Sequence, residues 1–234
     1  MLVFRSVRFE RLSVCLLVML LVSLCGCASD KPFRMENLAK GDIAFVGDIH
    51  IRRMDMMLRQ LTSKLYRRNP RHLPEQLTIE QRQNQLFSNI ETPLVFEELY
   101  QRKSSDAIDL AFNENFKGDR VFAFMVGVSE MVRRSYGYNE ELFLTDSLDQ
   151  QGLYNCARNL EIALWRLKNK RDANGQLFIL SNSQPGERRN LSYERLFGKM
   201  IATQDNMAEI VADRTNRTIT KVVQKVATAV FLPI

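Results

Sequence analysis

The chain has 234 residues, of which 45% are hydrophobic and 26% are charged, and its formal net charge at pH 7 is +6. This length is sufficient for one domain with a substantial apolar core. The excess of basic residues is mild, so the composition argues against nucleic acid as a partner.

Residues 1–26 have the three parts of a secretory signal peptide. Arg5, Arg8 and Arg11 form a basic region, residues 12–24 form an apolar run, and small residues follow. The apolar run has 13 residues, whereas a membrane-spanning helix needs about 20, so a cleaved signal is favoured over a permanent span. Removal of the signal leaves 30 basic and 26 acidic side chains, a net charge of +4.

The sequence LCGC at residues 24–27 resembles the lipobox of bacterial lipoproteins, in which an aliphatic residue, a small residue and Gly or Ala precede an acylated cysteine. The resemblance implies that Cys27 begins the mature protein and carries a lipid. Residues 28 and 29 are Ala and Ser rather than Asp, which favours the outer over the inner membrane. We therefore expect an acylated cysteine and tether at 27–36 and a single helical domain at 37–234. The alternative is an ordinary cleaved signal.

Apolar side chains from residue 43 to residue 65 recur with the spacing of an amphipathic helix, which Pro70 ends. A weaker helix candidate covers residues 75–89, a better one runs from Pro93 through Tyr100, and a short one carries residues 107–112. Gly118 and Asp119 supply a stop and an N-cap for a helix at 120–136, where apolar side chains cover more than one face. We expect that helix to be central.

Two further helical stripes cover residues 149–171 and 192–231, the second as one long helix or as two with a break near 215–217. The apolar runs LFLT (142–145) and LFIL (177–180) either pair as a small two-stranded β ribbon or are loops packed on the core. The predicted class is mainly α: a single helical-bundle-like domain, with the ribbon as an optional addition.

The sequence IAFVGDIH at residues 43–50 resembles the opening motif of calcineurin-like metallophosphoesterases. That family holds two metals with carboxylates and several histidines, but this chain has only His50 and His72 and lacks the family's later Gly-Asn-His blocks. We interpret His50 as a surface or helix-packing residue. Cys156, the one thiol that remains free if Cys27 is acylated, lies in an apolar stripe and is predicted to be buried and inert. We predict no catalytic residue, metal or cofactor.

Two polar groupings remain as candidate sites. One borders the stripe of helix 149–171 and consists of Asn155, Arg158, Asn159 and Glu161. The other lies on the long helix at intervals of four residues and consists of Asp205, Glu209, Asp213 and Arg217. Acids one turn apart repel each other unless a cation compensates them, so Arg158 with Glu209, Asp213 and Arg217 forms a candidate polar cluster. The alternative is two solvated faces with one interhelical salt bridge.

The stretches at residues 153–167 and 190–219 are similar to a family of uncharacterised lipoproteins of Gram-negative bacteria. This resemblance implies an envelope address and no assigned activity. We predict a periplasm-facing protein held on the outer membrane, or alternatively the inner membrane, by the lipid on Cys27. We expect it to be a non-enzymatic interaction module for an envelope protein. A small-ligand or lipid carrier with a pocket between helices is the alternative, and a hydrolase of unfamiliar type is the third.

Overall fold

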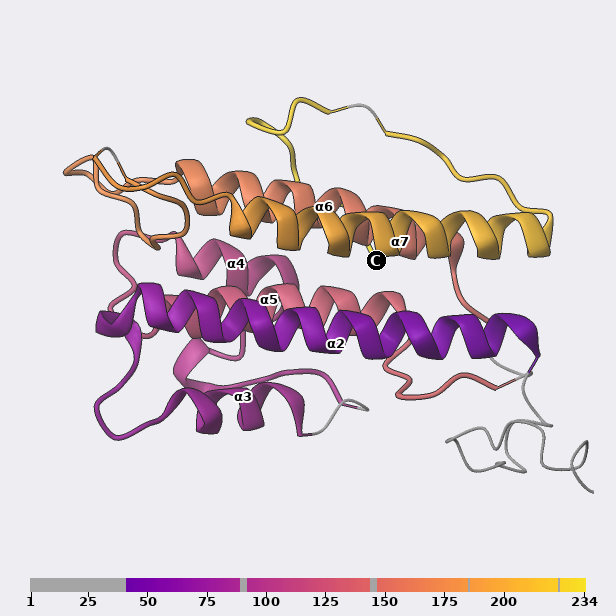
Figure 1. Cartoon of the computed structure of the whole chain (residues 1–234), viewed down its shortest axis with the longest axis horizontal. Helices are drawn as coiled ribbons and strands as arrows, with labels where there is room; N and C mark the ends of the chain where they lie inside the picture. Colours follow the sequence, from indigo (N-terminus) through magenta and orange to yellow (C-terminus); the bar gives the residue numbers. More distant parts are fainter. Residues whose placement is uncertain (1–40, 89–91, 144–146, 185, 223) are drawn as a thin grey trace, which may run out of the picture. The chain divides into compact units, whose positions relative to one another are not determined.

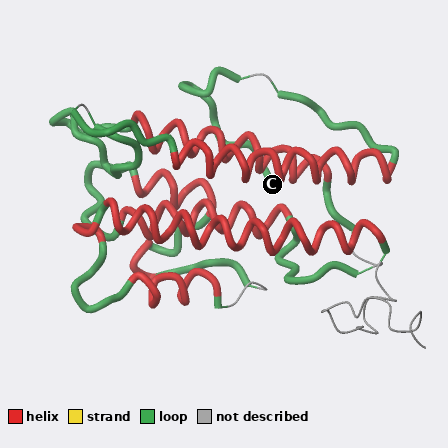
Figure 2. Tube along the Cα trace, viewed as in Figure 1, coloured by secondary structure: helices red, strands yellow, loops and turns green. Residues whose placement is uncertain are grey.

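Helices account for the regular structure that a computed structural model of the chain describes (Figures 1 and 2). The described residues are 41–88, 92–143, 147–184, 186–222 and 224–234, and all belong to one unit, Ala39–Ile234. They contain six α-helices and no β-strand, which confirms the mainly α class. The predicted signal, Cys27 and the predicted tether lie outside these residues. No described helix is both long and apolar enough to span a membrane.

The α-helices are α2 (Asp42–Arg68), α3 (Ile79–Phe87), α4 (Ser104–Ala111), α5 (Arg120–Ser135), α6 (Gln150–Asn169) and α7 (Ser192–Thr215). Two short 3-10 helices, η2 (Pro70–His72) and η3 (Glu97–Leu99), lie between them. Side-chain caps set several starts. Thr78 forms a capping box with Gln81 at the start of α3, and the Asp149 carboxylate accepts from the Gln151 and Gly152 amides at the start of α6.

Helix α5 lies at the centre of the fold, as its sequence predicts. Fifteen of its sixteen residues are buried, and it packs against α2, α3, α4 and α6. Gly127 permits the close approach of α4, because a Cβ atom at this position would lie 2.5 Å from the Ser104 carbonyl oxygen and 2.5 Å from Ile108. An α-helix that is apolar on more than one face is stable only when other elements surround it.

Helices α6 and α7 lie side by side and run in opposite directions, and α7 also packs along α2 (Figure 1). Two ion pairs fix the register of α6 against α7, one near the middle of both helices and one where the end of α6 meets the start of α7. Arg158 pairs with Asp205 at 2.6 Å, and Lys168 pairs with Glu194 at 2.9 Å. Helices α2, α5, α6 and α7 therefore form the bundle that surrounds the apolar core.

A buried charge cluster joins α2, α3, η3 and α5. The Tyr66 hydroxyl donates to the Asp119 carboxylate at 2.7 Å, and the same carboxylate lies 3.3 Å from the Arg82 guanidinium. Arg82 also donates to both carboxylate oxygens of Glu98, at 2.6 and 2.8 Å, and stacks over the Phe122 ring. Only 1% of the Arg82 and Asp119 side chains is exposed, so we assign this cluster to the structural core.

Two sequence predictions of helix are wrong. The segment from Pro93 to Tyr100 contains only η3, because Tyr100 and Gln101 adopt left-handed backbone conformations that an α-helix cannot accommodate. The long helix ends at Thr215, where Asn216 adopts a left-handed C-cap conformation, φ 54°. The apolar residues beyond it belong to an irregular segment instead of a continued helix.

The structure describes only part of the predicted ribbon, because residues 144 and 145 lie outside the described residues. Within the described part, Leu177 forms an isolated antiparallel bridge with Arg171. Leu142 instead packs on α2, where it lies against Gly47 and its amide donates to the Asp48 carboxylate at 2.7 Å. In the part that is described, the two runs thus contact different elements.

Candidate functional site

The structure brings together only part of the predicted polar cluster. Arg158 bridges Asp205 at 2.6 Å and Glu161 at 3.2 Å. Burial raises the pKa of Asp205, and the nearby charge of Glu209 adds to this rise. The side chains of Glu209, Asp213 and Arg217 are exposed and form no ion pair with another described residue. Of Asp205, Glu209 and Asp213, only Asp205 forms an ion pair with a described residue of α6.

A different grouping on α6 forms a more specific site, which we call the amide ladder: Gln151, Asn155 and Asn159. The spacing of four residues places these three side chains on one face of α6. They contact the segment after α7, residues 217–234, which we call the tail and of which residue 223 lies outside the described ones. Figure 1 shows the tail leaving the end of α7 and turning back toward α6.

Asn159 binds both main-chain groups of one tail residue. Its Nδ2 donates to the Leu232 carbonyl oxygen at 2.8 Å, and its Oδ1 accepts from the Leu232 amide at 2.7 Å. A side-chain amide that pairs in this way donates and accepts the same hydrogen bonds that a neighbouring β-strand would form with this residue. Only 1% of Asn159 is exposed, so loss of this pairing would leave buried polar groups without partners.

The other two members of the amide ladder extend this contact along the helix. Asn155 donates to the Pro233 carbonyl oxygen at 2.7 Å. Gln151 donates to the Asn155 side-chain oxygen at 2.9 Å and pairs with both main-chain groups of Thr220, at 2.8 and 3.1 Å. The amide ladder therefore holds the tail at its two ends, through main-chain atoms only.

Side-chain contacts between the tail and the bundle lie at the two ends of the tail, where Ile219, Phe231 and Ile234 are partly buried against the core. The Arg166 guanidinium lies over the Phe231 ring at 4.4 Å from its centroid and also pairs with Asp109 of α4. Most described residues from 217 to 230 are exposed, and Val230 is 72% exposed. A cavity of about 210 Å³ separates this part of the tail from α6, lined by Arg158, Glu161, Ile162, Val222, Gln224, Val226, Ala229 and Leu232.

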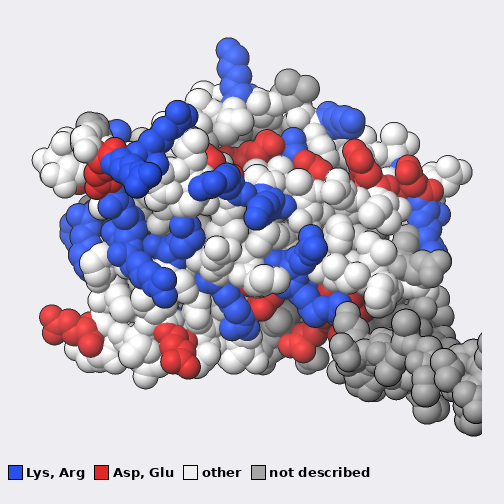
Figure 3. Space-filling view, viewed as in Figure 1, with Lys and Arg blue, Asp and Glu red and all other residues white. Residues whose placement is uncertain are grey.

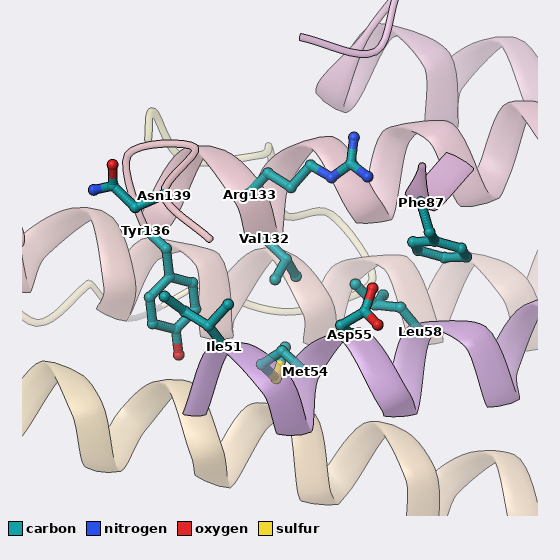
Figure 4. A pocket seen from close by; sticks show the side chains of 9 residues that line it. All are labelled: Ile51, Met54, Asp55, Leu58, Phe87, Val132, Arg133, Tyr136 and Asn139. Carbon is teal, nitrogen blue, oxygen red and sulfur yellow. The ribbon is translucent and has the colours of Figure 1, made fainter. Parts of the chain in front are cut away.

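Within the described part of the chain, the cavity between α2 and α5 is small. This cavity, lined by Met54, Leu58, Val132 and Tyr136 among others, measures about 30 Å³ (Figure 4). This volume is room for about one water molecule. Burial raises the pKa of the Tyr136 hydroxyl, with a smaller contribution from Cys156.

Basic side chains gather where the last turns of α2 lie beside the first turns of α7 (Figure 3). Lys64 donates to the Ser192 hydroxyl at 2.7 Å, and its pKa is lowered by burial and by the charge of Arg195. Arg67, Arg195 and Lys199 are exposed, and none of them forms an ion pair with another described residue. This surface attracts anionic groups, and the attraction weakens as salt rises.

The two residues tested for chemistry in the sequence have ordinary structural positions. Cys156 is a fully buried free thiol, and burial raises its pKa to about 12. His50 lies half-buried on α2 near Thr203 of α7, and burial lowers its pKa. Among the described residues, no three His, Cys, Asp or Glu side chains lie close enough together to hold a metal ion.

Comparisons with protein-family models, curated proteins and solved structures found no match to this chain. The assignment of the amide ladder as a candidate site therefore depends only on the geometry described above. Sequence reasoning singled out Asn155 and Asn159 but missed Gln151 and the tail they bind. Their spacing of four was the available signal, and the expectation of a helix beyond residue 217 concealed the partner.

Proposed function

We propose that this chain is an outer-membrane lipoprotein that faces the periplasm, anchored through acylated Cys27, and acts as a non-enzymatic interaction module for another envelope protein. The observation that carries the proposal is the amide ladder, because side-chain amides that pair with main-chain atoms form a surface suited to polypeptide. The signal and the lipobox at residues 1–27 support the envelope address.

The small size of the cavities among the described residues favours this function over a carrier of lipids or small ligands; one between α2 and the end of α7 measures about 170 Å³. Pockets for such ligands measure about 300 Å³ or more and bury most of the ligand surface. The cavity between α2 and α5 is about 30 Å³. The larger space beside α6 is about 210 Å³ and lies under an exposed segment of the tail. An acyl chain would therefore have to displace packed side chains of the bundle.

A cross-linking pull-down from intact bacteria tests the proposal. The tagged wild-type protein is compared with Cys27→Ala, which removes the acylation site, and captured proteins are identified by mass spectrometry. We expect one envelope protein in near-stoichiometric amount with the wild type and its loss with the variant. Correct membrane placement without any specific partner would contradict the interaction module.

A further inference from the structure

We propose that the amide ladder binds an extended segment of a partner protein, and that the tail is a built-in occupant which must leave first. This inference rests on the proposed function, and it adds the surface, the chemistry of the partner and the regulation. It follows from three properties of the contact: its use of main-chain atoms, the aromatic side chain of Phe231 against Arg166, and the exposure of the middle part of the tail.

The hydrogen bonds of the amide ladder do not select a sequence. Asn159 requires only a residue with a free amide and a free carbonyl, as Leu232 provides. Asn155 requires only a carbonyl, as Pro233 provides. Any extended polypeptide can supply these groups, and recognition of this kind is common where a peptide binds in extended form.

The side chains of the tail indicate which segment fits best. Phe231 lies against the Arg166 guanidinium of α6. Asp109 of α4 forms an ion pair with the same guanidinium. Proline is accepted at position 233 because the amide ladder uses the carbonyl at this position and needs no amide there. The partner segment is therefore extended and presents an aromatic residue, an aliphatic residue and a proline in that order.

The tail is attached at its two ends, where Ile219, Phe231 and Ile234 lie partly buried against the core, and it is attached loosely between them. It connects to α7 through the exposed residue Asn216, and most of residues 217–230 contact solvent. The cavity of about 210 Å³ lies between this part of the tail and α6. Segments with few buried contacts open at low free-energy cost. Helices α6 and α7 remain joined by the ion pairs of Arg158 and Lys168.

An attached tail competes strongly with a free segment, because its effective concentration is about millimolar. A partner therefore binds in proportion to the fraction of molecules whose tail is released. Weakening the tail should strengthen binding of a separate peptide, whereas weakening the amide ladder should abolish it. These opposite effects separate a binding site from a contact that only stabilises the fold.

The probe is a fluorescent peptide with the sequence of residues 217–234, and its anisotropy is measured with the full-length protein in detergent. Leu232→Pro removes the main-chain N–H that donates to the Asn159 side-chain oxygen, and it leaves the residues of the amide ladder unchanged. We expect this variant to bind the peptide at least about 10-fold more tightly than the wild type. Adding Asn159→Ala, or the isosteric Asn159→Asp, to Leu232→Pro should reduce binding at least about 10-fold.

Asn169→Ala is the matched control in the Leu232→Pro background, because Asn169 lies on α6 and, among the described residues, its side chain bonds only to the Trp165 carbonyl of its own helix. It should leave binding unchanged, and thermal unfolding verifies that each variant is folded. Equal binding by the wild type and Leu232→Pro, or binding that survives both Asn159 variants, would overturn the inference. Light scattering that finds tail-exchanged dimers, lost with Asn159→Ala, would also overturn it by assigning the site to a second copy.

The pull-down distinguishes a failure of this inference from a failure of the proposed interaction module. Capture of a partner that persists with Asn159→Asp would retain the interaction module and reject the amide ladder as its site. Peptide binding to the purified protein measures the amide ladder alone and does not depend on the membrane anchor.

Discussion

The Tyr66 hydroxyl donates a hydrogen bond to the Asp119 carboxylate at 2.7 Å, which joins the last turn of α2 to the start of α5 inside the core. The same carboxylate accepts from the Phe122 amide at 2.8 Å and thereby caps α5. One buried acid thus fixes both the start of the central helix and its position against α2.

We expect Tyr66→Phe to lower the free energy of unfolding by about 1–3 kcal/mol, because Asp119 would lose a donor in a buried site. Urea denaturation measures the change. Tyr154→Phe is the control: Tyr154 is half-buried, and its hydroxyl has no hydrogen bond to a described residue. It should change stability by less than about 0.5 kcal/mol. Equal effects of the two substitutions would contradict the assigned role of Tyr66.

The Asp119 carboxyl group gives stability a defined dependence on pH. Burial raises its pKa to about 6, against the opposing effects of the Phe122 amide, the Tyr66 hydroxyl and Arg82. Because the folded state binds this proton more tightly than the unfolded state, its contribution is present below about pH 4 and is lost as pH rises through about 6. The change amounts to at most about 3 kcal/mol.

Asp119→Asn removes this titration while keeping a side chain that caps helices well. We expect the stability of the wild type relative to Asp119→Asn to fall between pH 4 and pH 7, as measured by urea denaturation at each pH. A difference that stays constant over this range would show that Asp119 titrates at an ordinary value in the folded protein.

Two glycines predict opposite responses to the same substitution. Gly127→Ala places a Cβ against the Ser104 carbonyl oxygen at 2.5 Å, so we expect a loss of about 1–3 kcal/mol from overpacking. Gly198→Ala in α7 meets no atom within 4 Å and should add up to about 1 kcal/mol through helix propensity. Melting curves of both variants test the pair, and destabilisation by Gly198→Ala would contradict the packing of α7.

Thiol titration tests the burial of Cys156 and the acylation of Cys27 together. Protein purified from membranes should not react with Ellman's reagent at pH 8, because Cys156 is fully buried and burial raises its pKa to about 12. Unfolding in guanidinium should expose one thiol per chain. Two thiols after unfolding would show that Cys27 carries no thioether-linked lipid.

Much of the helical framework was predictable from local patterns. Helices α5 and α6 begin and end within two residues of their predicted bounds, because apolar spacing and caps such as Asp119 are local signals. The weak helix candidate at 75–89 is shorter in the structure, because the capping box of Thr78 and Gln81 begins α3 at Ile79. These features depend on residues fewer than five positions apart.

The parts that could not be predicted depend on contacts between distant residues. Tyr66 and Asp119 are separated by 53 positions, and Asn159 and Leu232 by 73. The described apolar residues after position 217 have helical spacing, yet they form no helix. Asn216 ends α7, and hydrogen bonds to the amide ladder hold the tail against α6. The candidate polar cluster was incomplete for the same reason, since only Asp205 faces Arg158.

The most direct test of the central claim is site-specific photo-cross-linking in living bacteria. A photoreactive amino acid replaces Glu161, which is half-buried and lines the cavity between α6 and the tail. The exposed residue Glu80 on α3 serves as the control position. We expect a covalent adduct with one envelope protein from position 161 and none from position 80, and Asn159→Asp should abolish it. Cross-links from position 161 to the protein's own tail alone would contradict the claim that this surface binds a partner.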